Sequence, residues 1–403
     1  MASLELPTLD YLDPELRGER LHRTVRELRQ RGWLARAPVG YVTLDRESSE
    51  FFLRSRSTVF PGLKIAELFE VPEGPLLEQI RRNILNLNGD DHRRLRNLVN
   101  PFFTPRAADR RRPLMRELLT ELWRELSPRG RCEAVQELAE PYPARVIARV
   151  VGAPVADAPL LQRWSRLIQQ QFDGPALLAR RAEIERACAE FYEYCGQLIS
   201  ERRRRPRDDL VSELVRAEQA GDRLSDVECM NLVLNVLVGG VETTQAQLAH
   251  ALRLFAEHRE QWRIVRERPE LIPQAVEEVL RYEPVTPFTA RLTIDDLEFR
   301  GIAFPAGTVV MVCALAANRD GVAGDPDRFD VTVDRGGART LTFGAGIHYC
   351  LGANLARAEL QEALAFLAPR MPELALAGEA ELGSVHGVYG VERLPLRWRS
   401  DAA

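Results

Sequence analysis

The stretch FGAGIHYCLG, from Phe343 to Gly352, contains three glycines, one histidine and one cysteine. It leads directly into LGANLARAEL, which predicts a helix, so we expect Cys350 at a helix N-terminus. Free backbone amides and the helix dipole favour thiolate over thiol at such a position. A thiolate there is either a nucleophile or a ligand to a soft metal centre. Because the glycines let the backbone lie close to a bulky, flat group, the pattern favours ligation.

A second stretch, LVGGVETTQ from Leu237 to Gln245, lies in a helix that we expect to run from Ser225 to about His258. Two adjacent glycines inside a helix cost about 1 kcal/mol each relative to alanine, so the close approach of a flat ligand would offset them. Glu242 and Thr243 follow within one turn, where a carboxylate and a hydroxyl could hold water and pass protons inward. A packing contact with another helix is the alternative for this stretch alone.

Two further patterns each place a pair of polar side chains on one face of a helix. Glu278 and Arg281 are three residues apart, and His92 and Arg96 are four apart. The second pair offers two donors that could grip carboxylates together. Either pair alone is typical of a solvated helix surface.

The rest of the chain predicts a mainly α fold with a small β portion. Helical periodicity dominates residues 90–283 and 351–368, and strand-like segments lie in residues 38–60, 290–320 and 385–398. We find no internal repeat and no linker composition. The sequence therefore predicts one domain over residues 1–403.

Composition excludes several classes of protein. The net charge is −4, from 55 basic and 59 acidic residues, which removes the general electrostatic argument for nucleic-acid binding. The N-terminus lacks the features of a signal peptide, and no apolar run is long enough to cross a membrane. Six dispersed cysteines without a CxxC pair indicate neither a zinc ribbon nor a disulfide framework. We therefore expect a cytoplasmic protein without a membrane anchor.

Taken together and in this order, the four patterns resemble the cytochrome P450 family of haem-thiolate monooxygenases over nearly the whole chain, and FGxGxHxCxG is highly specific to it. The resemblance implies a single P450-type fold with a long central helix over haem b. It makes Cys350 the proximal iron ligand and Phe343 the ring that shields its sulfur, with Gly344 and Gly352 in the same haem-binding loop. The residues that match positions holding the haem propionates are His92, Arg96, Arg291 and His348.

The resemblance also assigns roles within the long helix and the Glu–Arg pair. Glu278 and Arg281 match a structural triad, and Arg328 in PDRFD matches its third member. The residues that match the oxygen-activating segment are Gly239, Gly240, Glu242 and Thr243. Many soluble members have alanine where this chain has Gly239, a departure expected to loosen the helix over the haem.

The activity implied by this resemblance is reductive activation of dioxygen and insertion of one oxygen atom into a hydrophobic molecule, by hydroxylation or epoxidation. Thr243 would support oxygen activation while Glu242 relays protons from solvent. The apolar residues expected to line the substrate pocket are Leu234, Val238, Val285, Phe288 and Val388. Such a pocket suits a terpenoid, steroid, polyketide or aromatic substrate, with a role in secondary metabolism.

Other classes of protein share part of this pattern. A haem-thiolate peroxygenase or isomerase would need Cys350 but not the acid and alcohol pair. A cysteine hydrolase would leave the other three patterns unexplained, and a non-catalytic haem sensor could lose Glu242 and Thr243, which are both present.

Electrons are expected from a separate protein, because the chain has no flavin-binding glycine-rich unit and no cysteine cluster for iron and sulfur. By resemblance the donor is a soluble ferredoxin or flavodoxin served by its own reductase. Such carriers are typically acidic, so we expect a basic docking face. The arginines expected to form it are Arg93, Arg94, Arg106, Arg110, Arg111 and Arg112.

Overall fold

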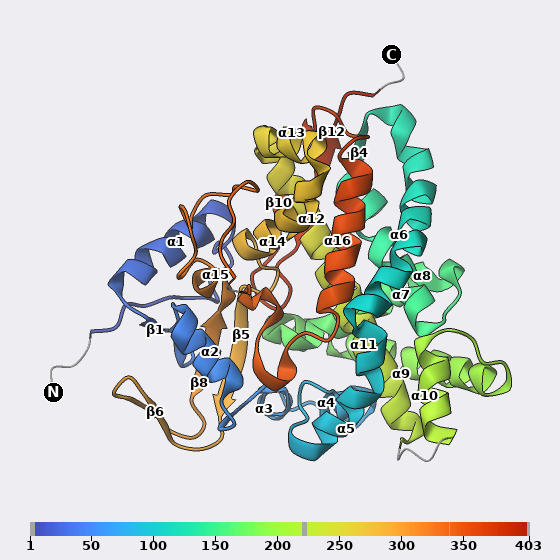
Figure 1. The fold of residues 1–403 in the computed structure, drawn as a ribbon. Coiled ribbons are helices and arrows are strands. Elements are labelled where there is room, and N and C mark those ends of the chain that lie inside the picture. Colours follow the sequence, from blue (N-terminus) through green and yellow to red (C-terminus); the bar gives the residue numbers. More distant parts are fainter. Residues whose placement is uncertain (1–4, 220–223, 338, 401–403) are drawn as a thin grey trace.

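The computed structural model describes residues 5–219, 224–337 and 339–400. Helices make up most of it, and a small sheet lies to one side of them together with the N-terminal helices (Figure 1). The architecture is mainly α with a small β portion, as the sequence predicts. That residues 1–403 form one domain stays a prediction.

The helical part is built around two consecutive helices, α11 (Asp226–Gly240) and α12 (Glu242–Glu257). The first packs against α7, α8 and α9, and the second against α14 and α16. In turn α16 lies along α6, as Figure 1 shows. The helices that surround this pair are α6 (Pro105–Leu126), α7 (Pro141–Val151), α8 (Ala158–Gln169), α9 (Gly174–Arg204), α10 (Leu210–Gln219), α13 (Arg259–Glu267), α14 (Ile272–Tyr282) and α16 (Ala353–Leu367).

The long helix expected from Ser225 to about His258 is interrupted. Its start is as predicted, because Ser225 and Glu228 form a capping box at the N-terminus of α11. At Val241, however, α11 ends and α12 begins. The two glycines before Val241 weaken the helix at this point. The interruption therefore lies in the segment that the sequence marks as distorted.

The main sheet has the strand order β1-β2-β8-β5-β3. Only β2 and β8 run parallel, and the other neighbours are antiparallel. In the pairing of β5 with β8, Arg291 lies opposite Val310. The strands are β1 (Leu34–Arg36), β2 (Tyr41–Thr43), β3 (Thr58–Val59), β5 (Phe288–Thr293) and β8 (Val309–Cys313).

Several short elements complete the described chain. Residues 61–87, which show little regular pattern in sequence, contain two helices that lead into α5. The remaining helices are α1 (Gly18–Arg31), α2 (Arg46–Arg54), α3 (Gly62–Leu68), α4 (Pro75–Arg82), α5 (Gly89–Val99) and α15 (Ala314–Ala317). The remaining strands are β4 (Arg131–Glu133), β6 (Leu297–Phe299), β7 (Ile302–Phe304), β9 (Ala375–Leu376), β10 (Glu381–Leu382), β11 (Val391–Arg393) and β12 (Pro395–Arg397).

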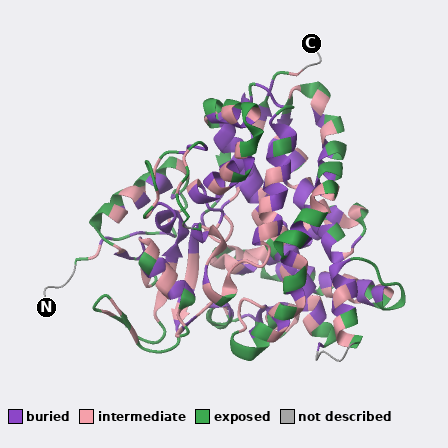
Figure 2. Cartoon of the chain, viewed as in Figure 1, coloured by how far each residue is buried: buried purple, intermediate pink, exposed green. Residues whose placement is uncertain are grey.

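The largest hydrophobic core joins the helices of this body, and α11, α12 and α16 all contribute to it. Figure 2 shows that buried residues gather on the inner turns of the helices and exposed residues on the outward turns. Within the described ranges, no helix combines the length and the apolar character needed to cross a membrane.

Candidate functional site

The loop that carries Cys350 is closed by its own backbone. The amide of Cys350 donates a hydrogen bond to the carbonyl of Phe343 at 2.9 Å. Gly346 has a φ of +73°, and a Cβ there would lie 2.6 Å from the carbonyl oxygen of Leu53. Only glycine is tolerated at such a position. Gly346 therefore serves the fold of the loop, and Cys350 lines a cavity. A Cβ on Gly344 or Gly352 would meet nothing within 4 Å, so the close approach of a flat group stays a prediction there.

The electrostatic setting of Cys350 differs from the prediction. The backbone amides of Gly352 and Ala353 donate to its sulfur and favour the thiolate, as expected. Burial is the larger effect, however, and it raises the pKa of the Cys350 thiol, while Arg96 and Arg357 act against it. Desolvation disfavours the charged form, and a local sequence pattern does not report it.

Phe343, the first residue of this stretch, has its ring packed against a cation. The guanidinium carbon of Arg357 lies 4.5 Å from the centre of the Phe343 ring. Arg357 is itself fixed, because its Nε donates to Glu277 Oε1 at 2.5 Å. Phe343 is therefore a positioned ring that lines the same cavity as Cys350.

Four basic or donor side chains, which we call the donor cluster, come together as predicted: His92, Arg96, Arg291 and His348. The rings of His92 and His348 lie 4.7 Å apart, centre to centre. His92 Nε2 and His348 Nδ1 are buried without a hydrogen-bond partner. Arg291 is 5% exposed, and its side chain donates only to the carbonyl of Ala290 among the described residues.

The donor cluster has no counter-charge. In the described part of the chain, no carboxylate forms an ion pair with any of its four members. Burial lowers the pKa of Arg291 to about 10 and, together with neighbouring cations, that of His348 to about 3. A buried guanidinium without an anionic partner is costly, so Arg291 in particular favours an anionic ligand, to which the imidazoles can add neutral N–H donors. The two propionates of haem fit these donors.

The two glycines before the α11–α12 junction have different roles. A Cβ on Gly240 would lie 2.5 Å from Cδ1 of Ile147, so Gly240 allows α11 to pack against α7. A Cβ on Gly239 would meet nothing within 4 Å, and this residue lines the cavity. Thr243 also lines the cavity, and its hydroxyl donates to the carbonyl of Gly239 at 2.6 Å. Packing against another helix thus explains Gly240, while the close approach of a flat ligand at Gly239 stays a prediction.

Glu242 does not line the cavity, although its neighbour Thr243 does. Burial, with a further contribution from Glu140 and Glu392, raises its pKa to about 7, and Arg166 opposes the shift. Its Oε1 is buried without a partner. Arg166 and Glu392 are both half exposed or more, so Glu242 lies between solvent-facing charges and the helix junction. Near neutral pH, such a carboxyl can both take up and release a proton.

The cavity has a volume of about 420 Å³ and is mostly apolar. Val238, Val285, Phe288 and Val388 line it as predicted, together with Gly344 and Gly352. Leu234 does not, because it is fully buried in the helical core. The residues of α11 that line the cavity instead are Leu232, Asn235 and Val236.

The prediction for Leu234 was wrong because of its angular position on α11. Successive residues of a helix are rotated by about 100°, so Leu234 points away from the face that carries Asn235. Sequence reasoning also missed Phe60, whose ring lies 5.6 Å from that of Phe172 at the cavity wall. The recurrence of residues 232, 235, 236 and 239 on one helix face was the available signal for α11.

The Glu–Arg pair belongs to a buried network, but its third member was predicted wrongly. Arg281 Nε and Nη2 donate to Glu278 at 2.7 and 2.8 Å. The second guanidinium on Glu278 comes from Arg335, at 2.7 Å. Arg328 has a side chain that is 67% exposed and pairs with Asp330; it contributes only its carbonyl to the network. We call Glu278, Arg281 and Arg335 the ionic triad.

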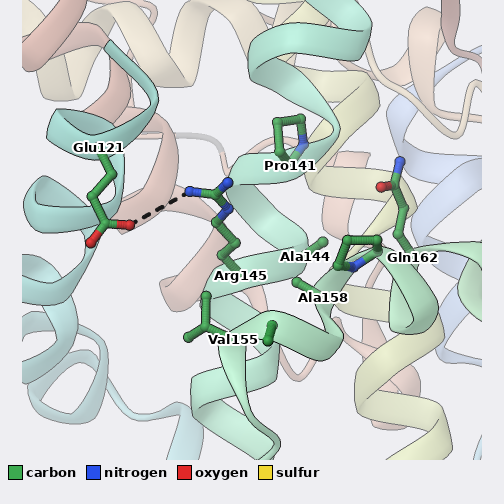
Figure 3. Close-up of a pocket in the computed structure, with 9 residues that line it drawn as sticks. Glu121, Pro141, Ala144, Arg145, Val155, Ala158 and Gln162 are labelled. Carbon is green, nitrogen blue, oxygen red and sulfur yellow. Dashed lines mark ion pairs between the residues drawn. The ribbon is translucent and has the colours of Figure 1, made fainter. Parts of the chain in front are cut away.

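A second pocket, of about 330 Å³, lies at the surface between α6, α7 and α8 (Figure 3). Arg145 and Glu121 form an ion pair across it at 3.6 Å. None of the predicted site residues lines it. The cavity at Cys350 is therefore the candidate active site.

Comparisons with known proteins agree with this geometry. The family model described as cytochrome P450 matches residues 160–367. The luteothin monooxygenase of Streptomyces thioluteus is 39% identical over 98% of this chain and 96% of its own length. The mycinamicin IV hydroxylase/epoxidase of Micromonospora griseorubida is 38% identical over 80% of this chain and 81% of its own. The crystal structure of CalO2 superposes with a TM-score of 0.91 at 31% identity, covering 99% of this chain and 100% of that one.

Proposed function

This chain belongs to the cytochrome P450 family, and from that premise we propose that Cys350 supplies the thiolate ligand of its haem. The cofactor is haem b, and the enzyme is a monooxygenase that inserts one oxygen atom from dioxygen into a hydrophobic small molecule. Its electrons come from a separate redox protein. The observation that carries the assignment of Cys350 is its place in one cavity with buried donors that have no anion.

The donor cluster would hold the haem propionates. Arg96, Arg291 and His348 line the cavity, the ring of His92 contacts that of His348, and none of the four has a carboxylate partner in the described structure. Charge-assisted hydrogen bonds to carboxylates are among the strongest that side chains make. Phe343, Gly344 and Gly352 would complete the pocket for the cofactor near Cys350.

When bound, the haem supplies the reductive activation of dioxygen. Thr243 would hold a proton at its hydroxyl, which the carbonyl of Gly239 orients at 2.6 Å. Glu242, with a pKa near 7, would exchange protons with solvent from the other side of the helix junction. Gly239 leaves open space beside Thr243 because it has no side chain. We propose Glu242 and Thr243 as the proton-handling pair.

A soluble ferredoxin or flavodoxin is the proposed electron donor, and the structure revises the docking face expected for it. Arg94 is half buried and pairs with Glu228. Arg111 turns inward and donates to the carbonyls of Phe102 and Ala107. Arg106 and Arg110, at the start of α6, are exposed. They are better placed than Arg94 or Arg111 to meet an acidic carrier.

The substrate would be a largely apolar secondary metabolite. Valine, leucine, isoleucine and phenylalanine side chains dominate the cavity wall. The relatives include a luteothin monooxygenase and a mycinamicin IV hydroxylase/epoxidase. A cytoplasmic location stays a prediction from the dispersed cysteines, all six of which are free.

The experiment that tests the role of Cys350 is the spectrum of the reduced holoenzyme with carbon monoxide. Thiolate ligation gives a red-shifted Soret band, and Cys350→His should lose this band while the circular dichroism of the fold is retained. Cys313→Ser is the control, because Cys313 is a buried cysteine of the sheet that does not line the cavity. A wild-type spectrum typical of imidazole ligation would overturn the assignment.

A further inference from the structure

Two asparagines of the cavity wall lie side by side although they are far apart in sequence. Asn83 precedes the turn that follows α4, and Asn235 lies in α11. Both line the cavity, and Asn83 is only 4% exposed. Their side chains contact consecutive residues of one turn, Ile84 and Leu85.

The orientation of both carboxamides is determined by hydrogen bonds to this turn. The amide of Ile84 donates to Asn235 Oδ1 at 3.0 Å, and the amide of Leu85 donates to Asn83 Oδ1 at 2.9 Å. A backbone N–H can bind only the oxygen of a carboxamide, so each Oδ1 is turned toward the turn. Each Nδ2 is left without a described protein partner, in a residue that lines the cavity.

The turn itself is rigid, which fixes the direction of the two donors. The amide of Asn86 donates to the carbonyl of Asn83 at 2.8 Å, and Asn86 Nδ2 donates to the carbonyl of Ile80 at 2.7 Å. The neighbouring cavity residues Ile84, Leu85 and Val236 offer no acceptor side chain. The cavity therefore presents two preoriented N–H₂ donors in an apolar wall.

Other uncharged polar side chains of the cavity can either donate or accept a hydrogen bond from a ligand. The hydroxyls of Thr286 and Thr289 can donate or accept a hydrogen bond. The carboxamide of Gln169 has no described bond that would hold it in one orientation. Apart from the donor cluster, Asn83 and Asn235 are the described lining residues whose hydrogen bonds turn a carboxamide N–H₂ away from the protein's own acceptors, so they favour an acceptor over a donor.

We propose that Asn83 and Asn235 determine specificity by binding a hydrogen-bond-accepting oxygen of the substrate, such as a carbonyl oxygen. The inference rests on the proposed function, since it concerns the substrate of that same cavity. Asn235 precedes Gly239 by four residues of α11, which is about 6 Å along the helix. The substrate is thus an apolar molecule with an acceptor group about one helical turn from the part of it that lies beside Gly239.

The test uses two probes of nearly the same shape, 4-acetylbiphenyl and 4-isopropenylbiphenyl, which differ by a carbonyl oxygen in place of a CH₂ group. Their dissociation constants for the holoenzyme are measured by isothermal titration calorimetry. We expect the wild type to bind the ketone about tenfold more tightly, since one or two hydrogen bonds of about 1 kcal/mol each separate the probes. The carbonyl stretch of the bound ketone should shift to lower wavenumber.

Asn83→Asp and Asn235→Asp are the decisive variants. Each keeps an oxygen for the amide of Leu85 or Ile84 but replaces the free donor with an acceptor. We expect either change to abolish or reverse the preference for the ketone and to remove the infrared shift. Asn97→Asp, at an exposed position of α5, adds the same charge elsewhere and should leave the preference unchanged.

Equal affinity of the wild type for the two probes, including failure to bind either, would overturn the inference, and so would a preference that survives both variants. Calorimetry needs no turnover. A holoenzyme that discriminates between the probes but lacks the thiolate spectrum would therefore refute the proposed role of Cys350 and leave this inference intact.

Discussion

The ionic triad and the donor cluster are both buried groups of charged side chains, yet they differ in how their charges are balanced. In the triad, one carboxylate accepts hydrogen bonds from two guanidinium groups, and carbonyl oxygens bind the remaining N–H groups. The donor cluster has imidazole nitrogens and a guanidinium without an anion. A buried network whose charges and hydrogen bonds are all paired within the protein stabilises the fold. A buried network without a counter-ion is suited to binding an anionic ligand.

The largest effect on stability is expected from breaking the satisfied network. Glu278→Leu leaves Arg281 and Arg335 buried without their carboxylate, which should cost about 3–5 kcal/mol of unfolding free energy. Urea denaturation measures it. Arg328→Leu is the matched control, and because this side chain is exposed its cost should stay within about 0.5 kcal/mol. Equal losses of unfolding free energy in the two variants would show that the Arg328 side chain belongs to the network.

Glu242 extends the comparison to a buried acid that lacks a partner. Its pKa is raised from an ordinary value of 4.5 to about 7, so the folded protein binds more protons than the unfolded chain between these values. Stability should therefore fall as pH rises through this range, by about 3 kcal/mol relative to Glu242→Gln. Urea denaturation of both proteins at pH 4.5 and pH 8 measures the difference. Parallel pH profiles would show that Glu242 titrates normally.

Removing one member of the donor cluster should affect haem retention more than the fold. Arg291→Leu deletes a buried cation without a described counter-charge, so we expect little loss of stability in the protein itself. Haem should transfer to apomyoglobin about tenfold faster, because one charge-assisted hydrogen bond is lost. The exposed Arg263→Leu serves as control. Unchanged haem transfer in Arg291→Leu would remove this residue from the cofactor site.

Thr243→Ala should have the smallest effect on stability and on haem binding. The hydroxyl makes one described hydrogen bond, to the carbonyl of Gly239, and the helix can do without it. The fraction of reductant that ends in product should nevertheless fall about tenfold, with hydrogen peroxide released instead, because proton handling is impaired. Peroxide and product are measured together against reductant consumption. Unchanged coupling would show that Thr243 has no part in proton handling.

The sequence by itself was sufficient for local features. The glycines around Cys350, the capping box at Ser225 and the spacing of Glu278 and Arg281 depend on neighbours in the chain, and each has the local structure that its pattern predicts. The helical class of the fold follows from periodicity, which is likewise a local property.

Tertiary structure decided what depends on distant segments. Arg335, and not Arg328, reaches Glu278 because the chain between them folds back on α14. Burial by the surrounding helices sets the direction of the pKa shift at Cys350 against the local amides. The turn after α4 and the phase of α11 together bring Asn83 beside Asn235. Desolvation and side-chain pairing across the fold arise only when the segments pack, and local sequence does not specify them.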